Sequence, residues 1–405
     1  MNIAFIVYFF PCLSETFILH QITGLLKQGH EIDIFARFNP NEDKVQSEVN
    51  SYNLMSRVCY IPKFKKSNLI FFALNKCIFR GLNYFYNKNN NKSFALIKFI
   101  KNSFLIQYFP WWVPFIGKKI DVVYCQFGQN GDIGIFLKNL GIKSKFVTMF
   151  HGSDIRLGIE KGGSIYKQLF KHGDIFFSIS EYNYKHLVKF GAPIDKIIYH
   201  PIGIDLKMFP FKWKSEEVQC QDPIIVLTVA RLVEEKGIKY GIYSIKELLE
   251  KIPEINIEYQ IIGDGPLKKE LENMVNTLNL NNYIRFLGSM DQEEIAIKMK
   301  KAHIFLLPSI AEALPTVLME AQAIGLPIVA THVGSITEII INKESGFIVP
   351  EGNVSAIVEK LEYLLNNSDK WEDMGRLGRK VVEEKYDINI LNKKLIGIFK
   401  DIIIN

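Results

Sequence analysis

Cysteine is scarce in this 405-residue chain, and no two cysteines form a C-x-x-C pair. The five cysteines are scattered and odd in number, so neither a disulfide framework nor a zinc site is indicated, which fits a reducing cytoplasm. The amino terminus has no Lys or Arg before its apolar run and no small-residue cleavage site, so a signal peptide is not expected. At about ten residues the run is too short to span a bilayer, and it predicts a buried parallel strand.

Several nucleotide-binding and metal-binding signatures are also absent. The chain has no P-loop, no H-E-x-x-H and no D-x-D, so a metal-bridged diphosphate site is not indicated. The segment "IIGDGP" around Gly263 looks like a nucleotide-binding turn, but Lys268 stands where a G-x-G-x-x-G fingerprint needs its third glycine. The sequence therefore disfavours a dehydrogenase and predicts no metal site.

Acidic residues are absent from residues 61–120, which carry eleven Lys or Arg and fifteen aromatic side chains. The net charge of +6 comes from this segment, because the rest of the chain has an excess of acidic residues. Around Trp111 and Trp112 the pattern is typical of an interface anchor, with rings at headgroup level and lysines beside anionic lipid. Alternatively, the aromatic residues pack the first domain's core and the lysines form a solvated face. Binding to nucleic acid is disfavoured, since no such motif accompanies the charge.

What the sequence does contain is a repeated alternation of β-branched apolar runs with helical patterns, which predicts βαβ units and a parallel sheet. The alternation occurs twice, on either side of residues 200–223, which hold three prolines and no periodicity. We therefore expect an α/β protein with two Rossmann-like doubly wound domains that face each other across a cleft. The expected boundaries are residues 1–205 for the acceptor-side domain, residues 206–385 for the nucleotide-sugar domain, and residues 386–405 for a helix that packs back on the first domain.

Two carboxylates, Glu312 and Glu320, stand eight residues apart, one before a helical run and one inside it. Pro315 suits the first turn of that helix, where no N–H is needed, and the free N–H groups beside it form a ready anion site. A diphosphate at the helix start would bring sugar hydroxyls within reach of both carboxylates, which are good hydrogen-bond acceptors. On spacing alone, a solvated loop residue and a surface helix position explain the pair better.

Charged residues also follow other predicted strands. Arg231 and Lys236 come after the strand "IIVLTVA", where a guanidinium fork and a point charge can neutralise a diphosphate. A lone cation in such a place is usually a solvated surface charge, but the pair together with the helix-start anion site is more specific. His151 and Asp154 follow a strand of the first half, where the histidine can hydrogen-bond a sugar hydroxyl or assist proton movement, or be structural.

These segments resemble family 4 of the retaining, nucleotide-sugar-dependent glycosyltransferases, which have the GT-B fold. The resembling pieces, among them "VARLVEEKG", "IIGDGPLKKEL", "FLLPSIAEALPTVLMEAQAIGLPIVAT" and "ESGFIVPEGN", stand in the family's order over roughly residues 226–353. In the first half, "FPCLSETFILHQITGLLKQGHEIDIFA" and "HGSD" resemble a subgroup that builds bacterial exopolysaccharide and colanic-acid-like repeat units.

The resemblance implies roles for particular residues. Arg231 and Lys236 match the pair that holds the donor diphosphate, Glu312 matches the glutamate that faces the transferred sugar, and Glu320 matches the one that takes the ribose hydroxyls. His151 matches a histidine near the donor sugar and the reaction centre. Further donor-binding positions are Gly263, Leu314, Pro315 and Thr316. Glu338 lies in the motif that follows, and the resemblance defines its role less closely.

The chain departs from the family pattern at two places. Ala313 follows the first glutamate where the family often has Gly. Many members carry a Gly-Gly turn after the first strand, whereas here Ser14, Glu15 and Thr16 form the acceptor-side loop. That loop usually meets the acceptor or a phosphate, so its different chemistry leaves the acceptor contacts open.

The resemblance implies a retaining, metal-independent glycosyltransferase of hexosyltransferase type. It would need no cofactor and would move a sugar from a nucleotide-diphosphate sugar, with a UDP-sugar as the expected co-substrate, to a glycan or polyprenyl-linked acceptor. We expect a cytoplasmic protein at the periphery of the inner face of the membrane, with an anionic membrane surface as partner and no nucleic acid. Two alternatives stay open: a nucleotide-sugar epimerase of the same fold, and a non-catalytic sugar-nucleotide-binding subunit at the membrane.

Overall fold

The computed structural model describes residues 1–13, 15–41, 45–61, 109–211 and 223–404. Contacts within the chain divide it into two compact units. The first unit comprises Met1–Ser178, His186–Ile198 and Leu395–Asn405, and the second comprises Ile179–Lys185 and Tyr199–Lys394. The carboxyl-terminal helix therefore contributes its last part to the first unit.

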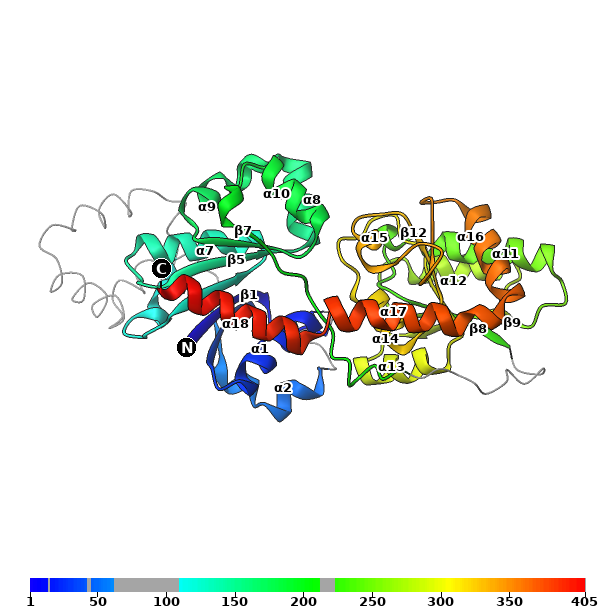
Figure 1. Ribbon diagram of the computed structural model, residues 1–405, viewed down its shortest axis with the longest axis horizontal. Coiled ribbons are helices and arrows are strands. Elements are labelled where there is room, and N and C mark those ends of the chain that lie inside the picture. The colour runs from blue at the N-terminus through cyan, green and yellow to red at the C-terminus, as the bar shows by residue number, and fades with distance from the viewer. Residues whose placement is uncertain (14, 42–44, 62–108, 212–222, 405) are drawn as a thin grey trace, which may run out of the picture. The chain divides into compact units, whose positions relative to one another are not determined.

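The first unit is built on a seven-stranded sheet with the order β3-β2-β1-β4-β5-β6-β7 (Figure 1). The pairings recorded between neighbouring strands are parallel, and β1 is buried along most of its length, as expected for a strand covered on both faces. The strands are β1 Asn2–Phe9, β2 Glu31–Phe38, β3 Val58–Tyr60, β4 Val122–Gln126, β5 Lys145–Phe150, β6 Ile175–Ser178 and β7 Ile197–Tyr199.

Helices connect these strands, so that the chain alternates between strand and helix as the sequence predicts. The helices are α1 Thr16–Lys27, α2 Ser47–Ser51, α6 Phe109–Trp112, α7 Gly128–Asn139, α8 Gly152–Lys161, α9 Lys167–His172 and α10 Glu181–Lys189. At the far end of the chain, the ring of Phe399 packs edge-on against the ring of Tyr124, with 5.3 Å between the centroids.

The second unit has a six-stranded parallel sheet with the order β10-β9-β8-β11-β12-β13. Its strands are β8 Ile224–Val229, β9 Ile257–Ile262, β10 Ile284–Gly288, β11 Ile304–Leu307, β12 Ile328–Thr331 and β13 Phe347–Val349. Its helices are α11 Ile238–Lys251, α12 Lys268–Thr277, α13 Gln292–Lys301, α14 Thr316–Ile324, α15 Ile336–Ile339, α16 Val354–Asn366 and α17 Trp371–Lys385, and the last helix, α18 Ile388–Ile404, is divided between the two units. The prediction of two doubly wound α/β domains is confirmed.

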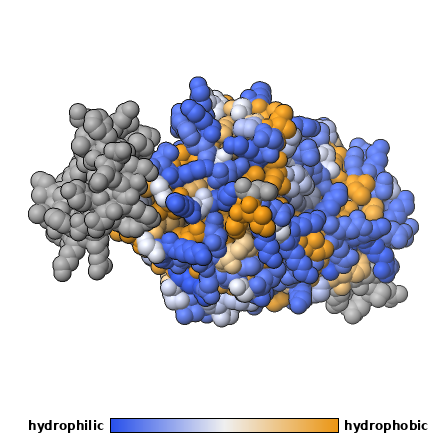
Figure 2. Space-filling model, turned by 60° about the vertical axis from the view of Figure 1, so that its left-hand side comes forward, coloured by the Kyte–Doolittle hydropathy of each residue, from blue (hydrophilic) through white to orange (hydrophobic). Residues whose placement is uncertain are grey.

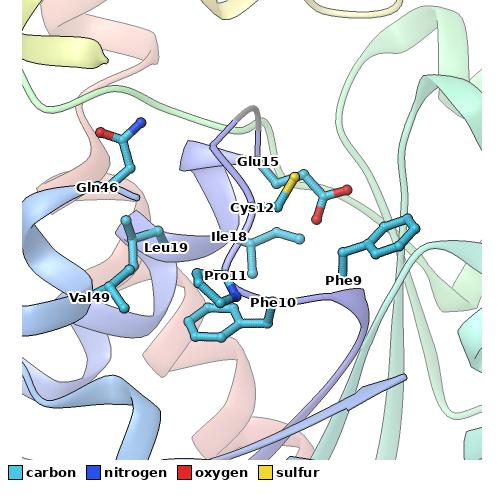
Figure 3. Close-up of a pocket in the computed structure, with 9 residues that line it drawn as sticks. All are labelled: Phe9, Phe10, Pro11, Cys12, Glu15, Ile18, Leu19, Gln46 and Val49. Carbon is cyan, nitrogen blue, oxygen red and sulfur yellow. The ribbon is translucent and has the colours of Figure 1, made fainter. Parts of the chain in front are cut away.

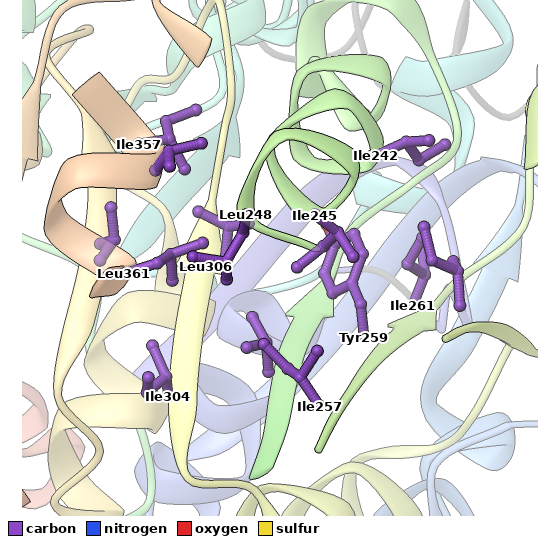
Figure 4. Packing of buried hydrophobic residues seen from close by; sticks show 14 of the residues in the cluster. Ile242, Ile245, Leu248, Ile257, Tyr259, Ile261, Ile304, Leu306, Ile357 and Leu361 are labelled. Atoms are coloured by element: carbon purple, nitrogen blue, oxygen red, sulfur yellow. The ribbon is translucent and has the colours of Figure 1, made fainter. Parts of the chain in front are cut away.

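The core of the second unit shows why these segments fold as they do. Isoleucines and leucines of α11 and α16 pack against the apolar face of β9 and β11 (Figure 4). Ile242, Ile245 and Leu248 recur at helical spacing on α11 and are fully buried. Each large aliphatic side chain buried in this way contributes about 1.5–3 kcal/mol. The apolar periodicity of the sequence therefore directly determines which face of each helix meets the sheet.

The aromatic segment of residues 61–120 is described only at its two ends, and residues 62–108 lie outside the described part. Trp111 and Trp112 are 1% and 4% exposed and belong to the core of the first unit, together with Phe115. The expectation that these two tryptophans sit at headgroup level is wrong, because their rings have no access to a membrane. The alternative, that aromatic residues here pack the core, holds for these described residues.

In the parts of the chain that the structure covers, none of the helices combines the length and the apolar character that crossing a membrane requires. The face shown in Figure 2 is mainly hydrophilic, and hydrophobic residues appear on it in patches between charged and polar ones. Most of the large hydrophobic side chains are used in the two cores.

Candidate functional site

The strand order of each sheet reverses at one point, and open α/β sheets bind ligands at the carboxyl ends of the strands beside that point. In the second unit the reversal lies between β8 and β11, which are hydrogen-bonded neighbours. Arg231 and Lys236 follow β8, and Glu312 follows β11. The topology therefore brings three of the predicted donor-site residues to the same edge of the same sheet.

Lys236 and Glu312 form an ion pair, with 2.6 Å between Nζ and Oε1. The hydroxyl of Ser309 donates a second hydrogen bond to the same carboxylate oxygen at 2.7 Å. The side chain of Glu312 is only 5% exposed, and that of Lys236 is 19% exposed. The alternative that Glu312 is a solvated loop residue is therefore wrong. A buried carboxylate held by a cation and a hydroxyl is oriented in advance.

The two loops that carry this pair are joined through their backbones. The N–H groups of Ile310 and Ala311 both donate to the carbonyl oxygen of Glu235, at 2.9 and 3.1 Å. Glu235 lies in the single 3-10 turn Glu234–Lys236 that presents the lysine. The distance between Lys236 and Glu312 is thus fixed by main-chain hydrogen bonds as well as by the ion pair itself.

Arg231 contrasts with Lys236. Its side chain is exposed and makes no hydrogen bond or ion pair with any residue that the structure describes. A guanidinium has five N–H donors that match the oxygens of a phosphate. Arg231 is therefore available to an anion from solution, whereas Lys236 is already engaged by Glu312.

Two glycines allow the neighbouring loops to approach this edge. Gly263 has φ +140°, and a Cβ placed on it would lie 1.9 Å from the carbonyl oxygen of Ala230. Gly334 has φ +55°, and its Cβ would lie 2.0 Å from the carbonyl oxygen of Glu312. No side chain fits at such distances, so both positions require glycine. The predicted donor-binding residue Gly263 therefore acts by letting the backbones after β8 and β9 touch.

Helix α14 begins at Thr316, and Pro315 is its N-cap, one residue earlier than the first-turn position that the sequence suggested. The N–H groups of the first helical residues have no partner within the helix, and the helix dipole places partial positive charge there. Leu314 is 5% exposed and anchors the entry to the helix. The start of α14 lies four residues after Glu312 in the chain. This short connection keeps the anion site at the helix start close to the Lys236–Glu312 pair.

Glu320 is not a surface helix residue, because only 4% of it is exposed. Its carboxylate accepts a hydrogen bond from Nε2 of Gln292 at 3.2 Å. Burial raises the pKa of Glu320 from 4.5 to about 7, and the hydrogen bond from Gln292 works in the opposite direction. A buried carboxylate with one weak protein donor has acceptor capacity left for paired hydroxyls.

Gln292 is itself held in place by the start of α13. Asp291 caps that helix by accepting from the backbone N–H of Glu294 at 2.8 Å, and the Glu294 carboxylate accepts from the N–H of Asp291 at 2.9 Å. This capping box fixes the first residue of the helix, which is Gln292. Gln292 stands 28 positions before Glu320, so no local sequence pattern pointed to it.

Glu338 has a structural contact that its motif did not suggest. Its carboxylate accepts from the backbone N–H groups of Glu181 and Tyr182 at 3.0 and 3.3 Å. These are the first residues of α10, whose unpaired N–H groups need acceptors. Glu338 therefore caps a helix from a distant part of the chain and binds residues Ile179–Lys185 into the second unit.

In the first unit the strand order reverses between β1 and β4, and His151 follows the next strand, β5. The His151 ring lies against Phe17 and Phe127, with centroid distances of 4.7 and 4.5 Å. Its Nε2 is 2.9 Å from Oε1 of Gln126, the last residue of β4. Phe127 adopts φ 71°, an unusual backbone angle for a residue with a side chain. Such strain is found most often around functional sites.

His151 is 4% exposed, and burial lowers its pKa to about 3. The ring therefore stays neutral at physiological pH and cannot act there as a cationic acid. Asp154 accepts from the backbone N–H of His151 at 2.7 Å and closes the start of α8. The pKa of Asp154 is raised to about 7, chiefly by burial, while backbone hydrogen bonds from His151 and Gly128 lower it and the charge of Glu15 makes a smaller contribution that raises it.

The acceptor-side loop is described only in part, because Ser14 lies outside the described residues. Glu15 is the N-cap of α1 and lines a small pocket, and Thr16 is the first residue of that helix. Within the described ranges, no group of three or more His, Cys, Asp or Glu side chains has the arrangement of a metal site. The described donor and acceptor residues thus offer hydrogen bonds and cations, with no metal ligand cluster among them.

Comparison with known proteins gives this arrangement a context. Residues 211–381 match the family described as Glycosyl transferases group 1. The amylovoran biosynthesis glycosyltransferase AmsK of Erwinia amylovora is 30% identical over 416 residues, covering 99% of both chains. The putative colanic acid biosynthesis glycosyltransferase WcaL of Escherichia coli is 29% identical over 418 residues, covering 99% of this chain and all of the relative.

Solved structures show the same fold over the whole length. Sucrose-phosphate synthase from Thermosynechococcus elongatus matches with a TM-score of 0.74 and 17% identity, over 99% of both chains. The Anabaena protein HepE, solved in complex with UDP and glucose, matches with a TM-score of 0.70 and 13% identity, over 99% of this chain and all of the other. These likenesses concern the fold, and they confirm the GT-B architecture that the sequence motifs predict.

Proposed function

Because this chain belongs to the group 1 glycosyltransferases, we propose that it transfers a sugar from a nucleotide-diphosphate sugar to a glycan or polyprenyl-linked acceptor. The relatives that match it over nearly their whole length are named for colanic acid and amylovoran biosynthesis. We therefore assign it to the biosynthesis of a bacterial surface polysaccharide. The expected place is the cytoplasm, at the inner face of the membrane, where a lipid-linked acceptor is accessible.

One observation carries this proposal, namely the buried Lys236–Glu312 pair at the carboxyl edge of the second sheet. The lysine balances the carboxylate before any ligand arrives, and the exposed Arg231 stands on the same loop. A donor diphosphate placed there would receive the Arg231 fork and share Lys236 with Glu312. An ion pair that only stabilised the fold would not need an unengaged guanidinium beside it.

We propose that the donor carries UDP. The support is that the structurally similar Anabaena protein was solved with UDP and with UDP-glucose. In this chain the ribose hydroxyls would donate to the Glu320 carboxylate, which has room for further hydrogen bonds beside Gln292. The diphosphate would lie at the start of α14, near the backbone N–H groups of Thr316 and its neighbour.

We propose a retaining reaction on the front face of the donor sugar. The bond between the anomeric carbon and the diphosphate oxygen breaks, and the acceptor hydroxyl oxygen forms its bond on the same face. The hydroxyl proton passes to the departing diphosphate oxygen, so the chain itself gains no covalent bond. Arg231 and Lys236 stabilise the negative charge that grows on the leaving group, and Glu312 faces the positive charge that develops on the sugar.

His151 fits this scheme as a neutral hydrogen-bonding group. Burial lowers its pKa to about 3, which favours the neutral ring near pH 7. The contacts with Phe17, Phe127 and Gln126 fix the ring, so it can orient a sugar hydroxyl without being charged. Its part in the reaction is positioning, and it needs no change of protonation state.

A thermal-shift screen of the full chain against UDP-, GDP- and dTDP-sugars tests the donor assignment. A donor present at 100 times its dissociation constant should add about 2.7 kcal/mol to the free energy of unfolding. We expect a UDP-sugar to give this shift and Arg231→Ala to abolish it. The Lys239→Ala variant serves as control, because Lys239 pairs with the exposed Glu234 on the adjoining turn.

The stabilising UDP-sugar is then incubated with the protein, with and without candidate acceptors, and the products are separated. Transfer with retained anomeric configuration supports the proposal. A changed donor sugar without any acceptor would instead mark an epimerase, and tight donor binding without turnover would mark a binding subunit. Wild-type turnover in a folded Arg231→Ala, Lys236→Ala double variant would overturn the site.

A further inference from the structure

Three aromatic side chains meet where β1 and β2 end in the first unit. Phe9 and Phe38 are the last residues of these strands and are paired in register. The Tyr8 ring lies edge-on to both, with centroid distances of 4.8 Å to Phe9 and 5.3 Å to Phe38. The Phe9 and Phe38 rings are 5.9 Å apart and tilted. We call Tyr8, Phe9 and Phe38 the aromatic shelf.

Part of the shelf is exposed to water. Tyr8 is 40% and Phe9 is 37% exposed, although the next residue, Phe10, is buried. The guanidinium of Arg37 lies 5.8 Å from the centre of the Tyr8 ring. Exposed aromatic rings that touch one another keep apolar area in contact with water, which is unfavourable unless a ligand covers it.

A carboxylate stands beside the shelf. Phe9, Cys12 and Glu15 line the same small pocket, together with residues of α1 and α2. Figure 3 shows the Glu15 carboxylate directed toward the side on which the Phe9 ring lies. The pocket floor includes apolar side chains such as Ile18 and Leu19, so the carboxylate is the charged group at its rim.

We propose that the aromatic shelf and Glu15 form a subsite for an uncharged sugar ring of the acceptor, separate from the donor site. The inference deepens the proposed function and rests on it, since it assigns the acceptor its chemistry. One face of a pyranose consists of C–H groups with slight positive charge, which lie favourably on the negative face of an aromatic ring. Its hydroxyl groups point outward from the ring edge, where the Glu15 carboxylate can accept from them.

The same features disfavour other ligands. A phosphate or diphosphate would meet the negative charge of Glu15, which lines the pocket beside the shelf. A prenyl chain would gain from a continuous apolar trough, but here the rings are flanked by Arg37 and Glu15. A sugar ring, which has polar hydroxyls at its edge and an apolar face, matches the shelf better than a phosphate or a prenyl chain does.

The experiment uses saturation-transfer NMR on the full chain with a panel of neutral tetrasaccharides from β-glucan, galactan and mannan. At least one should bind saturably, with the strongest transfer to the C–H protons of a ring face. The Tyr8→Ala, Phe9→Ala double variant should weaken that binding about tenfold, because two ring contacts are lost. The Tyr8→Leu, Phe9→Leu variant keeps apolar bulk without rings, and should be weakened as well.

Two controls keep the outcome specific. Tyr243→Ala removes an exposed tyrosine of the second unit, which is 41% exposed, and should leave oligosaccharide binding unchanged. The thermal shift with UDP should be the same in wild type and in both shelf variants. If UDP gives no shift in any of them while the shelf variants lose sugar binding, the donor assignment fails and the shelf survives.

Three results would overturn the inference. One is the absence of saturable binding by every oligosaccharide, and another is binding that the shelf variants do not weaken. The third is capture of farnesyl phosphate in detergent micelles by the wild type with loss in the shelf variants and no sugar binding, which would assign the shelf to a lipid.

Discussion

At the carboxyl edge of the second sheet the side chains that meet are ionic, whereas at the edge of the first they are mainly aromatic and neutral. Lys236, Glu312 and Arg231 gather at the former, and the buried charge of Glu312 is balanced before any ligand arrives. At the latter, His151 lies uncharged between two rings, and the aromatic shelf lies where β1 and β2 end. The difference matches our two proposals, a charged diphosphate bound by the second unit and a sugar ring bound by the first.

The largest expected effect is on the rate of transfer, from changes at the carboxyl edge of the second sheet, which we call the ionic edge. Replacing both Arg231 and Lys236 by Ala should reduce transfer by at least about a thousandfold, because the leaving diphosphate loses both cations. Initial rates with saturating acceptor measure the loss. Arg231→Ala alone should not change the melting temperature, since its exposed side chain makes no hydrogen bond or ion pair with a described residue. If the first unit supplied the cations instead, the double variant would keep its rate.

The next effect concerns the carboxylate of the same pair. Glu312→Gln keeps the size of the side chain and an oxygen for the Ser309 hydroxyl, but removes the negative charge that we propose faces the sugar. We expect kcat to fall by about a hundredfold or more with little change in donor affinity. The exposed Glu351→Gln variant is the matched control. A fall in donor affinity alone would reassign Glu312 to binding.

A smaller effect is expected from replacing Gln292. This change tests whether donor affinity at the ionic edge depends on pH. Donor affinity should rise as pH increases through about 7, because the ribose hydroxyls need the ionised form of Glu320. Gln292→Leu removes a hydrogen bond that lowers this pKa, so the rise should move to higher pH. At pH 7 the donor KM should increase up to about tenfold for each unit of displacement.

The control for this profile is the conservative variant Gln292→Asn, which has the same amide on a shorter side chain. A KM that rises equally at all pH values would mean that Gln292 acts only in packing. The folding stability of the unbound protein should change with pH in the opposite direction to donor affinity. A carboxyl group whose folded pKa lies above its unfolded 4.5 loses stabilisation as pH rises, so Glu320→Gln should flatten the decline of stability between about pH 4.5 and 7.

The smallest effect on turnover is expected from replacing Glu338. This residue follows β12 of the second sheet, but its contacts stabilise the fold. Glu338→Ala leaves the first N–H groups of α10 without their acceptor. The free energy of unfolding should fall by about 0.5–2 kcal/mol, as for other lost helix caps. Urea denaturation measures it, and Glu338→Gln should recover part of the loss. A turnover defect without any stability loss would instead place Glu338 in the reaction.

Much of the second unit could be predicted from the sequence, because its signals are local. Glu312, Pro315 and Glu320 stand within nine residues, and strand periodicity fixed the edge at which they emerge. Ser309 could have been found, since it precedes Glu312 by three positions. Gln292 could not, because its contact with Glu320 depends on how α13 and α14 pack.

The first unit was harder to predict for a physical reason. The aromatic residues of its sequence are numerous, and composition does not distinguish rings that fill a core from rings that meet a ligand or a lipid. Trp111 and Trp112 proved to be core residues, while Tyr8 and Phe9 are exposed beside a buried Phe10. Strand register and the bend after β1 decide which rings are buried in the core and which are exposed. Neither feature can be read from residue type.

The glycines at the ionic edge have a consequence for protein engineering. Gly263 lies against the carbonyl of Ala230, and Gly334 lies against the carbonyl of Glu312, at distances that exclude any side chain. The loops after β8 and β9 thus interlock, as do those after β11 and β12. A graft that imports one loop from another enzyme to alter donor preference should disturb its partner. Exchanging the loops as pairs should preserve the fit, which makes each pair the natural unit of recombination.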